Sequence, residues 1–183
     1  MKKFIDNDLI LYKTYYFSPI GELALLSDGN SLIEIRLYKS RYPSIAGNLK
    51  TVECDDLNIF KTTRIWLDKY FNNENPDLKD VPLKFIGSEF QKKVMSLLCE
   101  IPYGTVTTYK DIARKINPKM SAQAVGNAIG RNQLAIIVPC HRVIGANNNL
   151  VGFGGGLDVK KYLLNHEGVD VSKLKTPTKG NAL

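Results

Sequence analysis

The sequence predicts an α/β protein of two domains, in which a small α+β domain with an antiparallel sheet precedes a mostly helical domain that contains a helix-turn-helix. Three observations lead to this prediction. Two β-prone runs flank a hairpin turn at residues 28–30. An amphipathic helix with a capping-box start begins near residue 88. Two short helical segments, separated by a tight turn, follow that helix.

The N-terminal sheet is predicted from turn chemistry and strand propensity. The runs "GELALLS" (21–27) and "SLIEIRLY" (31–38) are joined by Asp28-Gly29-Asn30, which is a hairpin signal. The run "YKTYYFSPI" (12–20) precedes them and is rich in aromatic residues that favour strands. We therefore expect three antiparallel strands.

A helix and a linker complete the first unit. Apolar and aromatic side chains recur at helical spacing over residues 58–71, and they are expected to lie in the core. The next segment, "NNENPDLKDVP" (72–82), has the composition of a linker. We therefore expect residues 1–82 to form the N-terminal domain with its linker and residues 83–171 to form the C-terminal domain. Residues 172–183 are expected to be a disordered tail.

Capping residues mark the helices that open the C-terminal domain. Ser88 and Gln91 form a capping-box pattern, and an apolar stripe that ends at Ile101 follows them. Thr108 can cap a short helix over residues 109–116. The sequence thus predicts one long and one short helix before the turn at Asn117-Pro118.

The next helix, opened by Ser121, is poor in side-chain bulk. Its segment "AQAVGNAIG" (122–130) contains three alanines and two glycines, and each glycine costs a helix roughly 1 kcal/mol relative to alanine. Close packing on a neighbouring helix would explain this composition, and so would the close approach of a large ligand such as a duplex groove. The spacing of the two short helices is that of a helix-turn-helix.

An apolar run ends at a cysteine next to a histidine. Residues 134–138, "LAIIV", are expected to form a short buried strand or extended segment. Pro139 fixes its own φ and favours an extended residue before it, so Cys140 should emerge at a rigid bend with His141 directly after it.

A glycine-rich loop and a last helix close the domain. Three consecutive glycines, Gly154 to Gly156, indicate a mobile or tightly curved loop with exposed amides. Asp158 is expected to cap the helix "VKKYLLNHE" (159–167), and Gly168 is expected to end it in the left-handed conformation.

The net charge of +7 is unevenly distributed along the chain. Residues 1–82 hold 11 Lys and Arg against 12 Asp and Glu, whereas residues 83–183 hold 14 against 6. Basic residues can simply keep a small domain soluble. An excess concentrated in one half also fits a polyanionic ligand, with phosphate the obvious candidate.

Composition also excludes several classes of protein. No run approaches the length of a membrane span, and Asp6 and Asp8 interrupt what would be a signal peptide. The three cysteines are widely spaced, which fits free thiols in a reducing cytoplasm better than a disulfide framework. With two histidines and no C-x-x-C pattern, we expect no zinc site of ordinary ligand spacing.

Cys140 and His141 are the strongest candidates for chemistry. A free thiol is mostly protonated at neutral pH, so a reactive cysteine needs a nearby base or cation. Consecutive side chains of an extended segment point to opposite faces, so contact would require a bend or a bridging water. Glu167 on the last helix is the candidate carboxylate that orients the imidazole. Cys54 and Cys99 are interpreted as inert thiols.

These residues resemble those of a known family. Pro139-Cys140-His141-Arg142-Val143, with Asn132 before it and Gly154-Gly155-Gly156 after it, resembles the O6-alkylguanine-DNA alkyltransferases. The resemblance runs through residues 88–168 and includes "IPYGTVTTYKDIA" and "LLNHEG". The segment "SPIGELALL" resembles the family's first domain more weakly.

The resemblance implies a fold and an activity. The first domain would be ribonuclease H-like and the second winged-helix-like. The protein would flip an alkylated guanine out of double-stranded DNA and transfer the alkyl group, mainly methyl, from O6 to Cys140. An S-alkyl cysteine has no electrophilic carbonyl for water to attack, so the protein would react once. It would act as a monomer in the cytoplasm, without a metal or cofactor.

The resemblance also implies roles for individual residues. Cys140 would accept the alkyl group, His141 would act as its base through a water, and Glu167 would orient the imidazole. Asn132 would brace the turn, and Tyr109 would donate a hydrogen bond to the departing purine and favour nucleotide flipping. The positions implied to line the pocket or contact DNA are Gln123, Ala124, Arg131, Arg142, Val143, Gly152, Phe153 and Gly154.

The sequence departs from the family pattern at several positions. Gln123 stands where many members carry an arginine that fills the gap left by the flipped base, and it lacks the charge and stacking of a guanidinium. Phe153 replaces a common tyrosine, and Gly154 replaces a serine found in some members. The zinc ligands of some relatives' first domain have no counterpart. These departures concern DNA affinity, flipping and pocket shape.

Two other functions remain open from the sequence. A Cys-His hydrolase would turn over repeatedly, but the helix-turn-helix and the basic C-terminal half argue against it. An alkylated-base sensor or regulator would bind without repair, but pure recognition relatives lack a cysteine at the position of Cys140. The sequence does not tell whether larger alkyl groups or O4-alkylthymine are accepted.

Overall fold

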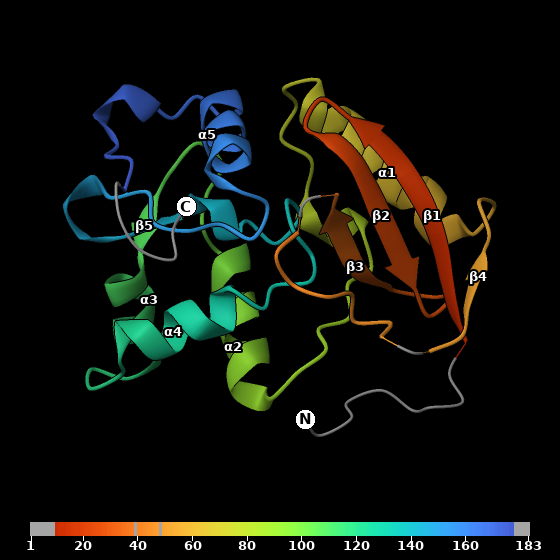
Figure 1. Ribbon diagram of the computed structural model, residues 1–183, viewed down its shortest axis with the longest axis horizontal. Helices are drawn as coiled ribbons and strands as arrows, with labels where there is room; N and C mark the ends of the chain where they lie inside the picture. The colour runs from red at the N-terminus through yellow and green to blue at the C-terminus, as the bar shows by residue number, and fades with distance from the viewer. Residues whose placement is uncertain (1–9, 39, 48, 178–183) are drawn as a thin grey trace.

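The computed structural model describes residues 10–38, 40–47 and 49–177 (Figure 1). The predicted absence of a signal peptide at residues 1–9 lies outside this range. The strands and α-helices follow in this order: β1 (Leu11–Ser18), β2 (Gly21–Ser27), β3 (Leu32–Leu37), β4 (Thr51–Glu53), α1 (Asn58–Phe71), α2 (Glu89–Cys99), β5 (Thr107–Thr108), α3 (Tyr109–Ile116), α4 (Ala122–Ile129), β6 (Val143–Ile144) and α5 (Leu157–His166).

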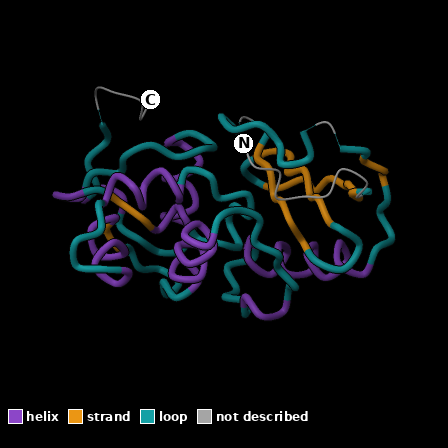
Figure 2. Tube along the Cα trace, turned by 90° about the horizontal axis from the view of Figure 1, so that it is seen from below, coloured by secondary structure: helices purple, strands orange, loops and turns teal. Residues whose placement is uncertain are grey.

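The N-terminal sheet has four strands in the order β3-β2-β1-β4. The three predicted strands pair antiparallel, and the predicted turn is closed by the Asp28 carboxylate, which accepts from the amides of Asn30 and Ser31. The expected sheet is nevertheless incomplete, because β4 pairs parallel to β1. All three β4 residues are exposed, so its strand carries no alternation that the sequence could reveal. Helix α1 lies along one face of the sheet (Figure 2).

The C-terminal helices begin where their capping residues predict. Ser88 forms the complete capping box with Gln91 at the start of α2. The Thr108 hydroxyl accepts from the Asp111 amide at 3.1 Å and opens α3. The Ser121 hydroxyl accepts from the Gln123 amide at 3.2 Å and opens α4. Helices α3 and α4 are joined by a tight turn, as a helix-turn-helix requires.

The two domains share one core. Buried side chains from the sheet, from α1 and from the C-terminal helices belong to a single cluster. The edge strand β3 also forms a bridge with the C-terminal domain, where the Ile35 amide donates to the Gln133 carbonyl at 2.7 Å. The segment between α1 and α2 is held against α1, because Trp66 Nε1 donates to the Asp77 carbonyl at 2.9 Å. The N-terminal domain is therefore fixed against the segment that leads to Cys140.

The segment expected to be a strand at residues 134–138 is a buried turn instead. All five residues are buried, but Ile136 has a φ of 74° and the Val138 amide donates to the Leu134 carbonyl at 2.8 Å. A short apolar run indicates burial and leaves the backbone conformation undetermined, which is why the prediction of its conformation was wrong.

Two further expectations at the C-terminal end need correction. Asp158 lies in the first turn of α5, whose N-cap is Gly156 with a φ of 92°. Residues 172–177 were expected to be disordered, but Lys175 pairs with the 148–150 loop through two backbone hydrogen bonds of 2.8 and 2.9 Å. The remainder of the expected tail, residues 178–183, lies outside the described residues. Gly168 does end α5, with a φ of 81°.

Candidate active site

Cys140 lies at the start of a short 3-10 helix, Cys140–Arg142, immediately after Pro139. The residue is 8% exposed, and its Sγ accepts a hydrogen bond from Asn132 Nδ2 at 3.0 Å. Asn132 also donates to the Val138 carbonyl at 2.9 Å and accepts from the Leu134 amide at 3.0 Å. One amide side chain thus holds the buried turn and the thiol together.

His141 is completely buried, and its ring is oriented by Glu167. Its Nε2 lies 2.6 Å from Glu167 Oε1. Because a carboxylate only accepts, Nε2 carries the hydrogen and Nδ1 presents a lone pair. Nδ1 has no hydrogen-bond partner among the described residues. Burial lowers the pKa of His141, and the hydrogen bond and charge of Glu167 oppose this only in part, so the imidazole is neutral and basic at Nδ1.

Glu167 is the most heavily bonded carboxylate of the site. Besides His141, it accepts from Arg142 Nε at 2.7 Å, from Arg142 Nη2 at 3.0 Å and from the Tyr70 hydroxyl at 2.8 Å. The Gly104 amide donates at 3.3 Å. Burial raises the pKa of Glu167, but the hydrogen bonds from His141 and Arg142 and the charge of Arg142 outweigh it and bring this pKa to about 2. The carboxylate is therefore ionised at neutral pH.

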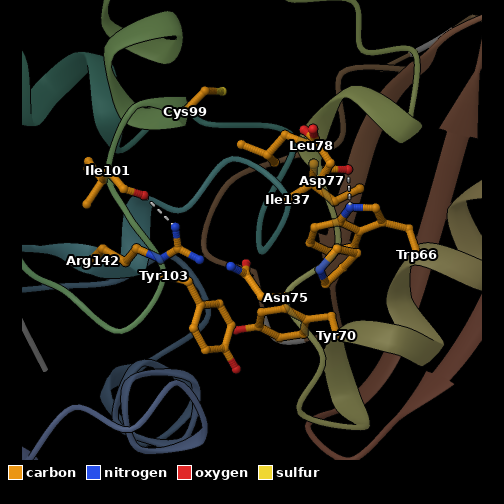
Figure 3. Close-up of a pocket in the computed structure, with 11 residues that line it drawn as sticks. Trp66, Tyr70, Asn75, Asp77, Leu78, Cys99, Ile101, Tyr103, Ile137 and Arg142 are labelled. Carbon is orange, nitrogen blue, oxygen red and sulfur yellow. Dashed lines mark hydrogen bonds between the residues drawn. The ribbon is translucent and has the colours of Figure 1, made fainter.

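Arg142 does not occupy the position expected for a DNA or pocket contact. It is 7% exposed, pairs with Glu167, and donates from Nη1 to the Ile101 carbonyl at 2.6 Å. The 3-10 turn directs this side chain into the interior, beside a cavity of about 340 Å³ between the two domains (Figure 3). Tyr70 and Trp66 of α1 line the same cavity. Arg142 thus supports the carboxylate that orients His141.

The thiol of Cys140 lies in a buried environment that contains a cation. Burial raises the pKa of Cys140, while the Asn132 hydrogen bond and the charge of Lys160 lower it. Lys160 is fully buried, and its Nζ donates to the Val143 carbonyl at 2.7 Å and the Leu150 carbonyl at 2.5 Å. The pKa of Lys160 is lowered to about 8, chiefly by burial.

Sequence reasoning missed Lys160, although a signal for it exists. Lys160 shares a helical stripe with Leu163, Leu164 and Glu167, all of which are buried. A lysine at i with apolar residues at i+3 and i+4 lies on the inner face of its helix. The stripe could therefore have identified it as a buried cation.

Tyr109 and α4 form the neighbouring wall. Tyr109 is the first residue of α3, and burial raises the pKa of its phenol, with further contributions from Cys140 and Tyr42. A Cβ on Gly126 would lie 3.6 Å from the Tyr109 ring, so the small residues of α4 do permit close packing. Gln123 and Asn127 on the other side of α4 are exposed and face solvent. Close packing therefore explains the small residue at Gly126, and the exposed face of α4 remains available to a ligand.

The other expected contact residues are distributed around this wall. Arg131, just beyond α4, is exposed, and Ala124 is half-buried. Gly152, Phe153 and Gly154 are half-buried in the loop before α5. Val143 is fully buried on β6.

The glycine loop is pressed against the N-terminal domain. A Cβ on Gly155 would lie 2.4 Å from Leu37 Cδ1 and 3.2 Å from the Phe153 ring, so a side chain there would force Leu37 to shift. The loop is thus held in place by β3.

Comparison with known proteins agrees with this geometry. Residues 11–85 match the ribonuclease-like domain of 6-O-methylguanine DNA methyltransferase, and residues 89–169 match its DNA binding domain. The chain belongs to the 6-O-methylguanine DNA methyltransferase family. The predicted family and the two-domain fold class are therefore confirmed, apart from the parallel fourth strand.

Individual relatives cover nearly the whole chain. A methylated-DNA–protein-cysteine methyltransferase of Haemophilus influenzae is 43% identical over 157 residues, which is 86% of each chain. One from Methanosarcina acetivorans is 40% identical over 86% of this chain and 99% of its own. The crystal structure of Mycobacterium tuberculosis OGT in complex with DNA has a TM-score of 0.77 and 36% identity over 89% of this chain and 94% of that one.

Proposed function

We propose that this protein repairs DNA by transferring a methyl group, or another alkyl group, from O6 of guanine to Sγ of Cys140, once per molecule. The observation that carries the proposal is the arrangement of His141. Its Nε2 is held by an ionised Glu167, its Nδ1 lone pair is unengaged by any described residue, and His141 directly follows Cys140 in the chain. This is a neutral general base adjacent to a thiol.

The transfer is a displacement at the alkyl carbon. The thiol proton of Cys140 moves to Nδ1 of His141, through a bridging water, because adjacent side chains do not face each other directly. The sulfur then forms a bond to the alkyl carbon as the bond from that carbon to O6 breaks, and the electron pair of the broken bond passes to guanine. Glu167 neutralises the imidazolium that forms.

Three other side chains support this step. Asn132 holds Sγ in place, and the buried ammonium of Lys160 favours the thiolate. Tyr109 keeps its phenolic proton because its pKa is raised, so it serves as a hydrogen-bond donor to the purine ring as negative charge develops there. The proton balance closes when guanine takes up one proton and the cysteine has lost one.

DNA is the partner that the second domain suits. The exposed face of α4, with Gln123 and Asn127, is available to a groove, and Arg131 and Lys110 are exposed beside it. A base inside the stack is out of reach of a sulfur that is 8% exposed, so the nucleotide must rotate out of the duplex. The protein acts as a monomer, since one chain supplies the relay and the helix-turn-helix. We place it in the cytoplasm, where its free thiols persist.

Intact-protein mass spectrometry tests the proposal. After incubation with duplex DNA that contains O6-methylguanine, the protein should gain the mass of one methylene unit, because a methyl group replaces the thiol hydrogen. Cys140→Ala should gain nothing. Cys99→Ala is the matched control and should react normally, because burial raises the pKa of Cys99 to about 11 and leaves that thiol unreactive. Tight binding without any mass gain would instead indicate a sensor, and repeated release of methanol would indicate a hydrolase.

A further inference from the structure

Tyr42 of the N-terminal domain contacts two segments of the C-terminal domain, the end of α4 and the glycine loop before α5. It lies in the loop between β3 and β4, and a Cβ on Gly130, at the end of α4, would lie 2.7 Å from its hydroxyl. A Cβ on Gly154 would lie 3.6 Å from its ring. Neither glycine has a side chain, so the Tyr42 ring fills the space between them.

The loop that carries Tyr42 is held on both sides. On one side the Arg41 amide donates to the Gly154 carbonyl at 3.0 Å, which ties this loop to the glycine loop of the C-terminal domain. On the other side the Ser44 hydroxyl donates to Glu34 at 2.5 Å, and Glu34 is itself buried on β3. In Figure 1 the orange loop after β3 bulges toward the C-terminal helices. These two hydrogen bonds hold the loop so that it presents Tyr42 to the C-terminal domain.

Solvent exposure increases from Cys140 through Tyr109 to Tyr42. Cys140 is 8% exposed, Tyr109 is half-buried, and Tyr42 is 43% exposed. Tyr109 is within electrostatic range of both others, because burial first and then Cys140 and Tyr42 raise its pKa. Gly130, against which Tyr42 packs, is two residues before Asn132, whose Nδ2 donates to Cys140 Sγ, so Tyr42 contacts the chain near the reactive sulfur.

We propose that Tyr42 is a specificity-determining residue that limits the size of the O6-alkyl group reaching Cys140. The inference deepens the proposed function and rests on it. A methyl group adds little to the volume of guanine, so O6-methylguanine fits beneath the Tyr42 ring. A benzyl group needs more space beside O6. On that side the wall is formed by the glycine loop and by the Tyr42 ring, which packs on the loop.

Rates of alkyl transfer from matched substrates test this inference. The full-length chain is reacted with one duplex that contains O6-methylguanine and with the same duplex that contains O6-benzylguanine. Tyr42→Ala should raise the benzyl-to-methyl rate ratio about tenfold, the usual effect of a change in pocket volume. Tyr42→Leu should raise the ratio less. Tyr42→Phe keeps the ring and should leave the ratio unchanged.

Tyr38→Ala is the matched control, because Tyr38 begins the same loop and is 76% exposed. It should leave the ratio unchanged. An unchanged ratio in Tyr42→Ala would overturn the inference, and so would an equal fall of both rates, which would mean that the ring only holds the loop. Failure of the proposed function would look different, since the unmodified protein would then accept no methyl group.

Discussion

Replacing Glu167 by glutamine should destabilise the protein strongly at neutral pH. The change keeps the shape of the side chain and removes its charge. Arg142, which is 7% exposed, would lose its ion pair and keep only uncharged partners: the Ile101 carbonyl, the new amide oxygen and the Tyr103 ring. Removing one partner of a buried pair typically costs about 3–5 kcal/mol.

The pKa of Glu167 gives an independent magnitude. Folding lowers this pKa from its ordinary value of 4.5 to about 2. That difference corresponds to roughly 3 kcal/mol of stability at neutral pH. Because the pKa is lowered, the contribution is fully present above pH 4.5 and is lost as the pH falls to about 2. The stability gap between the native protein and Glu167→Gln should therefore narrow over this window.

Urea unfolding at pH 7 and pH 3 measures the difference in unfolding free energy between the native protein and Glu167→Gln. The fluorescence of Trp66 is a convenient probe, because Trp66 is the single tryptophan and is buried. Glu100→Gln is the control, since Glu100 pairs with Lys115 only at the surface, where an ion pair contributes at most about 1 kcal/mol. If the two variants had equal stability at pH 7, the reasoning would be refuted. Glu167→Gln should also slow alkyl transfer by roughly 10⁴-fold, because an amide no longer fixes the hydrogen on Nε2 of the imidazole.

Two further predictions follow from buried contacts. Gly155→Ala should lower the melting temperature, because the new Cβ would lie 2.4 Å from Leu37 and overpacking costs about 1–3 kcal/mol. Gly126→Ala is the control and should not lower it, because its Cβ would lie 3.6 Å from the Tyr109 ring. Lys160→Met should slow the reaction of Cys140 with iodoacetamide at pH 7, because the thiolate loses a nearby cation. This difference should shrink above pH 8, where Lys160 itself releases its proton, and a pH-independent difference would contradict the electrostatic explanation.

Local interactions made much of the fold predictable. The Asp28 turn, the Ser88 capping box and the Thr108 cap each depend on side chains within three residues of the backbone groups that they bind. Such contacts form whatever the distant chain does, and the corresponding elements begin where expected. The same holds for the bend at Pro139, which places Cys140 and His141 together.

Contacts between segments far apart in the sequence could not be predicted and became known only from the tertiary structure. Strand β4 has no pattern of its own, and its parallel pairing depends on β1 forty residues earlier in the chain. Residues 134–138 were recognisably apolar, but their turn is also held by the distant edge strand β3, where Ile35 bridges to Leu134. Arg142 appeared to be a ligand contact until the fold brought Glu167 beside it.

The sequence by itself determined the two-domain class and most element boundaries, and it singled out the residues that we propose carry the chemistry. It could do so because caps, turns and the Cys-His adjacency are local. Only the tertiary structure decided what surrounds those residues: the Tyr70 hydroxyl reaches Glu167 across 97 positions, and the N-terminal loop carries Tyr42 to Gly154. These contacts exist because the two domains bury one common core, and burial brings together residues whose separation along the chain contains no information about their distance in space.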